Sequence, residues 1–132
     1  MTKVVIDTNV LVSGILTPQG NEANVLDLIA ASKLTWCLSE PVLAEYRRVL
    51  FEKLGFDPLH VQWCFDLAKD GQLVVSTEVL AESPHETDNR FYECAAAAQA
   101  DFIVTGNARH FKKPYKNTRI VTARQLLELV GA

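Results

Sequence analysis

Short apolar runs alternate with amphipathic segments along this chain. The amphipathic segments carry apolar residues three and four positions apart, the spacing of helices that pack one face against a sheet. The apolar runs are short and rich in β-branched residues, which predicts buried strands. These predicted strands are Val4–Ile6, Leu34–Leu38, Leu73–Val75, Phe102–Thr105 and Arg119–Val121. Such alternation predicts an α/β fold with a mainly parallel sheet of four to five strands and helices on both faces.

The predicted helices have recognisable boundaries. Ser39 and Thr122 are good N-cap residues, and Gly55 can end the helix that Ser39 begins. Asp88 stands before another apolar stripe and can cap the helix there. The helices are predicted at Glu22–Ser32, from Ser39 to about Lys53, at Pro58–Lys69, from Asn89 to about Gln99, and after Thr122.

Composition indicates an ordinary globular protein. A length of 132 residues predicts one domain, residues 1–132, and the apolar share of 48% with 22% charged residues is typical of a packed core. No apolar run is long enough to span a bilayer, and the start of the chain reads as a strand and not as a signal peptide. The three cysteines are widely spaced, so we expect reduced, buried thiols in a cytoplasmic protein.

Basic residues gather late in an acidic chain. The net charge is −3, yet no Asp or Glu occurs between Phe102 and Leu127. Lysine-rich loops are commonly just solvated, but a basic segment beside a metal site could also hold phosphates. The segment contains six of the 13 Lys and Arg residues: Arg109, Lys112, Lys113, Lys116, Arg119 and Arg124.

Acidic side chains fall where the predicted elements would bring them to one edge of the sheet. Asp7 follows the first strand, Glu45 lies one turn into a helix, and Asp88 begins another. Asn107 lies just past the fourth strand. Binding crevices of open α/β sheets lie outside the carboxyl ends of the strands. Carboxylates gathered there suit Mg²⁺ or Mn²⁺, which can activate water against a phosphodiester.

Each acid also has a purely structural explanation. Asp7 could cap the following turn, although an Asp directly after a buried strand favours a site. Glu45 could pair with Arg48 or the arginine before it, and Asp88 could serve only as an N-cap. Glu93 lies on the same helix as Asp88, and we expect it to be solvated.

The order and spacing of three blocks are similar to those of a known family. The blocks are IDTNVLVS, SEPVLAEYRRVL, and DNRFYECA with ADFIVTGNARHF. Together they resemble the PIN domain, and more narrowly the PIN proteins of the VapC toxin type, over nearly the whole chain. The resemblance implies a three-layer α/β/α sandwich and a metal-dependent ribonuclease that leaves a 5′-phosphate and a 3′-hydroxyl. It also implies an antitoxin partner, homodimers, and Asp7, Glu45 and Asp88 as the carboxylates that hold Mg²⁺ or Mn²⁺.

One position departs from the family pattern. Members often have an acid after the Thr-Gly pair, whereas here the sequence is Thr105-Gly106-Asn107. The Asn107 amide oxygen can ligate Mg²⁺ or hold a water, but it adds no charge, so a second metal should bind more weakly. Asn107 could equally supply only turn geometry. Asn9 and Thr105 are candidate supporting residues around the acids.

Other classes remain open at this stage. A haloacid-dehalogenase-type phosphatase needs a second Asp two residues after the first, where this chain has Asn9, and a phosphorelay receiver needs an acidic pair that is missing. An inactive module that binds RNA or an antitoxin, or a structural partner with solvated acids, stays possible.

Arg109, Lys112 and Lys113 directly follow the Thr-Gly-Asn turn, so we expect them to contact RNA phosphates. Replacing both lysines, Lys112→Ala with Lys113→Ala, should weaken RNA binding and flatten its dependence on salt, because each lost phosphate contact lowers the number of released counterions. Binding isotherms at several salt concentrations measure this slope. An unchanged slope would reject the role.

Overall fold

A computed structural model describes residues 1–82, 85–106 and 114–132. A parallel sheet has the strand order β3-β2-β1-β4-β5 in this part of the chain. Its strands are β1 (Lys3–Ile6), β2 (Thr35–Leu38), β3 (Gln72–Leu73), β4 (Phe102–Val104) and β5 (Arg119–Val121). The sheet is parallel throughout, as the alternating sequence pattern predicted.

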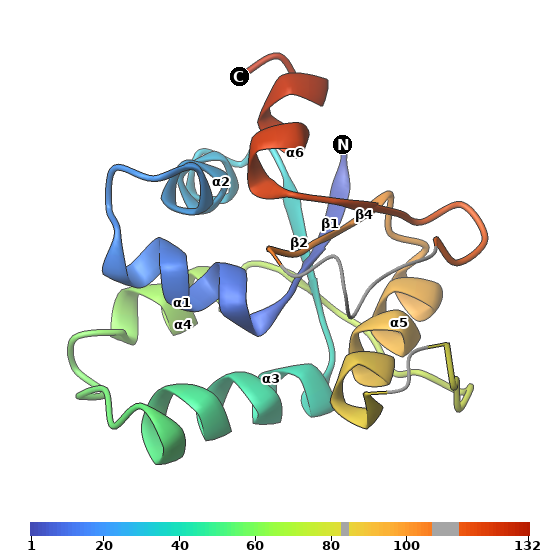
Figure 1. Ribbon diagram of the computed structural model, residues 1–132, viewed down its shortest axis with the longest axis horizontal. Helices are drawn as coiled ribbons and strands as arrows, with labels where there is room; N and C mark the ends of the chain where they lie inside the picture. The colour runs from blue at the N-terminus through green and yellow to red at the C-terminus, as the bar shows by residue number, and fades with distance from the viewer. Residues whose placement is uncertain (83–84, 107–113) are drawn as a thin grey trace.

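Helices cover both faces of the sheet, which gives three layers (Figure 1). On one side α1 packs against α2 and α2 against α6, while on the other α5 contacts β1, β2 and β4. The predicted α/β/α sandwich is confirmed. The helices are α1 (Thr8–Leu16), α2 (Asn21–Ala30), α3 (Glu40–Arg47), α4 (Gln62–Lys69), α5 (Glu86–Ala98) and α6 (Ala123–Leu129), and the π-helical segment η1 (Arg48–Lys53) continues α3.

The core begins with the central strand. Val4, Val5 and Ile6 of β1 are fully buried, because helices cover the sheet on both faces. The helix α1 was not predicted. It buries Val10, Leu11 and Gly14, and a Cβ on Gly14 would stand only 2.7 Å from a methyl group of Leu26. Glycine at this position therefore allows α1 to approach α2 closely.

Other helices and strands begin or end a few residues away from their predicted boundaries. The predicted helix at Pro58–Lys69 begins only at Gln62, after a turn, and the strand predicted at Leu73–Val75 is Gln72–Leu73. The helix predicted from Asn89 begins three residues earlier, at Glu86. No helix in the described ranges has both the length and the apolar character needed to cross a membrane.

The three cysteines are free and buried, as predicted. Burial raises the pKa of Cys37 to about 11 and the pKa of Cys64 and Cys94 to about 12. All three thiols therefore keep their protons at neutral pH, and since the thiolate is the reactive form, none is suited to act as a nucleophile.

Two of the three predicted N-caps, Ser39 and Thr122, are confirmed. The Ser39 hydroxyl accepts the N–H of Val42 at 3.3 Å at the start of α3. At the start of α6, the Thr122 hydroxyl accepts the N–H of Gln125 at 3.1 Å, and the Gln125 side chain accepts the N–H of Thr122 at 2.9 Å. This reciprocal arrangement is a capping box.

Replacing Thr122 by alanine should lower the free energy of unfolding by about 1 kcal/mol, because the N–H of Gln125 loses its acceptor. The matched control is Thr122→Ser, which keeps the hydroxyl and should stay close to the wild type. Urea unfolding of the three proteins measures the difference. Equal midpoints for the alanine and serine variants would show that the cap contributes nothing.

Candidate functional site

Asp7 joins β1 to α1 at the carboxyl end of the central strand. Its N–H donates to the carbonyl of Val104 at 2.9 Å, and its own carbonyl accepts the N–H groups of Val10 and Leu11. Its side chain is buried and makes no cap bond to α1. Instead, carboxylate oxygen Oδ2 accepts the hydroxyl of Thr105 at 2.7 Å. The carboxylate of Asp7 therefore faces the end of β4, and capping does not explain its position.

Thr105 is the residue directly after β4, and it was one of the predicted supporting residues. Its N–H donates to the carbonyl of Val121 at 2.9 Å, which fixes it beside β5. Its hydroxyl is buried and holds one oxygen of Asp7. The structure thus brings these two predicted residues together at the carboxyl edge of the sheet, whereas their role toward a metal stays a prediction.

Tyr46 links the elements that carry the three acids, and the sequence interpretation missed it. Its ring is almost fully buried, and its hydroxyl donates to the carbonyl of Ile6 at 2.5 Å, next to Asp7. The ring lies 6.2 Å from that of Phe91 on α5, one turn after Asp88. Burial also raises the pKa of Tyr46 well above its ordinary value, so the hydroxyl keeps its proton and acts as a donor.

These contacts place the ends of three elements near one another. The end of β1 and the first turns of α3 and α5 lie on the same side of the molecule, in the lower part of Figure 1. The packing of α5 on β1 and of α3 on α5 agrees with this arrangement. The elements that carry the three acids therefore meet on one side of the molecule, whereas a shared role of the acids toward a metal stays a prediction.

Glu45 lies on α3 beside Tyr46 and forms an ion pair. Its two carboxylate oxygens accept hydrogen bonds from Arg48, at 2.7 Å from Nη2 and 3.1 Å from Nε. The arginine side chain is half exposed. Exposed pairs of this kind are weak, so the contact can open at little cost when a stronger ligand arrives. This pair is the structural alternative that the sequence left open for Glu45.

Asp88 does not cap α5. The cap position belongs to His85, and Asp88 is the third residue of the helix, with its N–H donating to the His85 carbonyl at 3.0 Å. Its side chain is only 6% exposed, and that of the next residue, Asn89, is 1% exposed. A carboxylate buried in the first turn benefits from the positive end of the helix dipole. The N-cap interpretation of Asp88 was therefore wrong, because the helix begins earlier.

Glu93 is not solvated, contrary to expectation. Only 7% of it is exposed, and its oxygen Oε2 accepts the N–H of Leu80 at 2.9 Å and a guanidinium N–H of Arg90, also at 2.9 Å. Arg90 also pairs with Glu86 at 2.7 Å. Glu93 therefore anchors the segment before α5 to the helix, so its charge is already compensated.

The other predicted site residues divide into two groups. Asn9 is exposed in the first turn of α1, and its expected support of the acids stays a prediction. Asn107, Arg109, Lys112 and Lys113 lie outside the described residues.

The side chains at this edge carry the type of oxygen ligand that a hard cation prefers. Asp7, Asp88 and Thr105 offer carboxylate and hydroxyl oxygens, which Mg²⁺ and Mn²⁺ prefer. The Thr8 hydroxyl, next to Asp7, is buried and has no hydrogen-bond partner among the described residues, so an ion or a water beside it would satisfy it. However, no group of three His, Cys, Asp or Glu side chains comes together within the ranges described.

The fold is a parallel α/β domain, and the buried Asp7 carboxylate lies at the end of its central strand. Such sheets carry their binding sites at this edge. The chain belongs to the PIN domain family, which it matches over residues 3–109. Members of this family are generally nucleases. Curated protein sequences include no significant match to the chain.

Solved structures support the fold independently. The chain is similar to a chain in the crystal structure of VapBC2 from Rickettsia felis bound to a DNA fragment from their promoter. The TM-score is 0.62 at 19% sequence identity, and the match covers 90% of this chain and 97% of that chain. At this identity, the likeness establishes the fold.

Replacing Tyr46 by phenylalanine should lower the free energy of unfolding by about 1–3 kcal/mol, because the buried carbonyl of Ile6 loses its hydrogen bond. Tyr115→Phe is a suitable control, since the hydroxyl of Tyr115 only reaches Glu78 at 3.3 Å on the surface. Urea unfolding compares both variants with the wild type. Similar losses in the two variants would contradict a special role for the Tyr46 hydroxyl.

Proposed function

We propose that this PIN domain is a metal-dependent ribonuclease that hydrolyses RNA phosphodiesters and serves as the toxin of a toxin-antitoxin pair. Membership of the PIN family supports a nuclease, and the VapBC2 structure supports pairing with an antitoxin. The observation that carries the proposal is the buried Asp7 carboxylate, held by Thr105 at the carboxyl edge of the sheet.

Asp7, Glu45 and Asp88 would hold Mg²⁺ or Mn²⁺ in this proposal. When bound, the ion supplies an activated water and stabilises the charge on the phosphate. The Thr105 hydroxyl orients Asp7, and Tyr46 holds the elements that carry the acids. Glu45 would exchange its surface partner Arg48 for the ion. Asn107 would complete the catalytic group with a neutral oxygen, which favours one tightly bound metal.

The partners follow from the same proposal. Arg109, Lys112 and Lys113 would hold RNA phosphates that the acidic body of the protein otherwise repels. A cognate antitoxin and a second copy of the chain would complete the assembly, as the VapC type implies.

A second function has its own support. The protein would be an inactive PIN module that binds RNA or an antitoxin without cleavage. The neutral Asn107 in the usual place of an acid favours it.

Millimolar Mn²⁺ should raise the thermal unfolding midpoint of the wild type and leave that of Asp7→Asn unchanged. A ligand that binds only the folded state stabilises it, by about 2.7 kcal/mol at a hundredfold excess over Kd. Asp27→Asn, which changes an exposed acid on α2, is the control and should respond like the wild type. Scanning calorimetry with and without Mn²⁺ measures all three.

Cleavage of a labelled RNA separates the two functions. Mn²⁺-dependent cleavage by the wild type and by Asp27→Asn, lost in Asp7→Asn, supports the ribonuclease. Metal stabilisation without cleavage of any RNA supports the inactive module. If Mn²⁺ stabilises none of the proteins, the three-acid site is wrong.

A further inference from the structure

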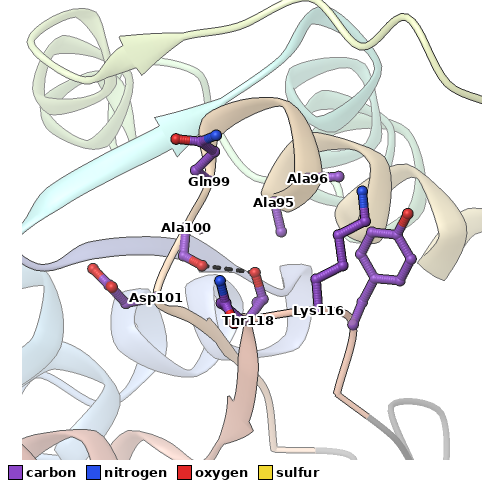
Figure 2. Close-up of a pocket in the computed structure, with 9 residues that line it drawn as sticks. Ala95, Ala96, Gln99, Ala100, Asp101, Lys116 and Thr118 are labelled. Atoms are coloured by element: carbon purple, nitrogen blue, oxygen red, sulfur yellow. Dashed lines mark hydrogen bonds between the residues drawn. The ribbon is translucent and has the colours of Figure 1, made fainter.

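The cavity in Figure 2, of about 400 Å³, lies between the end of α5 and the turn that leads into β5. The Lys116 ammonium stands 5.3 Å from the centre of the Tyr115 ring, so it covers the aromatic face there. The Gln99 amide and the Asp101 carboxylate turn away from the cavity in Figure 2. These polar side chains therefore do not converge on a ligand, whereas the opposite edge of the sheet, at β3, carries a different kind of surface.

An apolar groove of about 230 Å³ lies between α3, α4 and β3. Its apolar lining consists of Leu38, Leu43, Phe65, Ala68 and Leu73. The ring of Phe65 stacks against that of Phe51, with 5.6 Å between their centres, which fixes one wall. Leu38 at the bottom of the lining is buried, whereas Leu73 on β3 is 58% exposed. The groove therefore leads from the core to the surface along β3.

Strand β3 is an edge strand, because it pairs only with β2 among the described residues. Leu73 is the partner of Leu38 in the parallel register, and the N–H of Val74 donates to the carbonyl of Leu38 at 2.7 Å. In such a ladder the backbone groups of successive residues point alternately toward the neighbouring strand and away from it. The N–H and C=O of Leu73 therefore point outward, where another extended chain can bond to them.

This outer edge lacks most of the devices that prevent unwanted strand pairing. Natural edge strands are commonly covered, charged or interrupted by proline. Segment 71–75 contains no proline and no charged residue, and Val75, two residues after Leu73, is 84% exposed. Only the shortness of β3, which has two residues, limits pairing. An apolar edge of this kind, next to an apolar groove, indicates a surface that a partner covers.

The charges around the groove indicate the chemistry of that partner. Arg47 and Lys69 belong to the lining, which contains no acidic side chain among the described residues. Arg47 forms no ion pair with any other described residue. Lys69 pairs with Asp66 at 3.3 Å, but both side chains are exposed, so this pair contributes little. The groove is thus a local basic patch on a chain of net charge −3, and it attracts an acidic segment.

A second copy of this chain fits the groove less well. Pairing of β3 with β3 across a twofold axis would bring the same surface patch of both copies together. Two sets of Arg47 and Lys69 would then lie at one interface, and their repulsion disfavours it. An acidic partner neutralises the same charges instead.

We propose that this groove docks an extended acidic segment of a partner protein. The segment bonds to the outward backbone of Leu73, seats an apolar side chain between Leu43 and Phe65, and directs carboxylates to Arg47 and Lys69. Peptides that add to a sheet edge gain affinity from main-chain bonds and specificity from pockets for alternate side chains. Alternating acidic and apolar residues are therefore the expected pattern. The proposal goes beyond the ribonuclease function and does not depend on it.

The test uses a fluorescein-labelled peptide in which glutamate alternates with leucine and valine, and a matched peptide with lysine in place of each glutamate. Fluorescence anisotropy without RNA or metal should show that the wild type prefers the acidic peptide. Arg47→Glu with Lys69→Glu should weaken its binding about tenfold or more, because attraction becomes repulsion at two positions. Lys33→Glu with Lys53→Glu, which makes the same change of net charge at exposed residues outside the groove, is the control and should have a much smaller effect.

The apolar and backbone contacts are tested separately. Leu73→Ser should weaken binding of the acidic peptide, whereas Val79→Ser, at a residue that is 90% exposed and outside the groove, should not. Hydrogen exchange of the Leu73 amide should slow when the peptide is bound, because the peptide accepts its outward N–H. Thermal unfolding midpoints close to that of the wild type show that each variant is folded.

Several results would overturn the proposal. Equal binding of the two peptides by the wild type, or no binding of either, rejects an acidic partner. Equal losses in the Arg47/Lys69 and Lys33/Lys53 variants reject the groove as the site. Charge-dependent binding that leaves the Leu73 amide exchange unchanged rejects addition to the edge of β3. Sedimentation that shows a dimer of the wild type, dissociated by Leu73→Ser, assigns the groove to a second copy and rejects the partner segment.

Discussion

The hydrogen bond from Tyr46 to the carbonyl of Ile6 is the interaction on which the candidate site most depends. It ties α3 to the last residue of the central strand, and its ring packs against Phe91 of α5 and Trp36 of β2. The end of β1 and the helices α3 and α5 carry the three predicted carboxylates, Asp7, Glu45 and Asp88. Without this bond the Tyr46 hydroxyl and the Ile6 carbonyl would both be buried with neither a hydrogen bond nor water. The energy of the bond therefore favours one arrangement of β1, α3 and α5 over others.

Periodicity predicted most of the fold because the strands are buried on both faces and the helices on one. The helix α1, which was not predicted, shows the limit of prediction from periodicity. Its buried residues, Val10, Leu11 and Gly14, have helical spacing, but the β-branched valines and the glycine disfavour a helix locally. Packing against α2 overrides that preference, and packing is not visible in a local pattern. The early start of α5 has a different cause, since Glu86 and Arg90 pair four residues apart along its first turns.

The candidate site was only partly predictable. Asp7 stood out because an acid directly after a buried strand has a clear location, and the structure gives it a polar neighbour in Thr105. Tyr46 falls four residues after Val42 and four before Leu50, a buried stripe that the sequence offered. We instead singled out its neighbour Glu45 as a candidate carboxylate. Glu93 was misjudged because its partner Leu80 comes from a distant segment, which no helical spacing can show.

The two ends of α5 differ in their surroundings. Its first turn buries Asp88, where the helix dipole favours a negative charge, and its last turn leads into Gln99 at the opposite edge of the sheet. Between them Phe91, Cys94, Ala95 and Ala98 fix the helix against the core. A helix fixed in this way holds Asp88 at one position relative to the central strand.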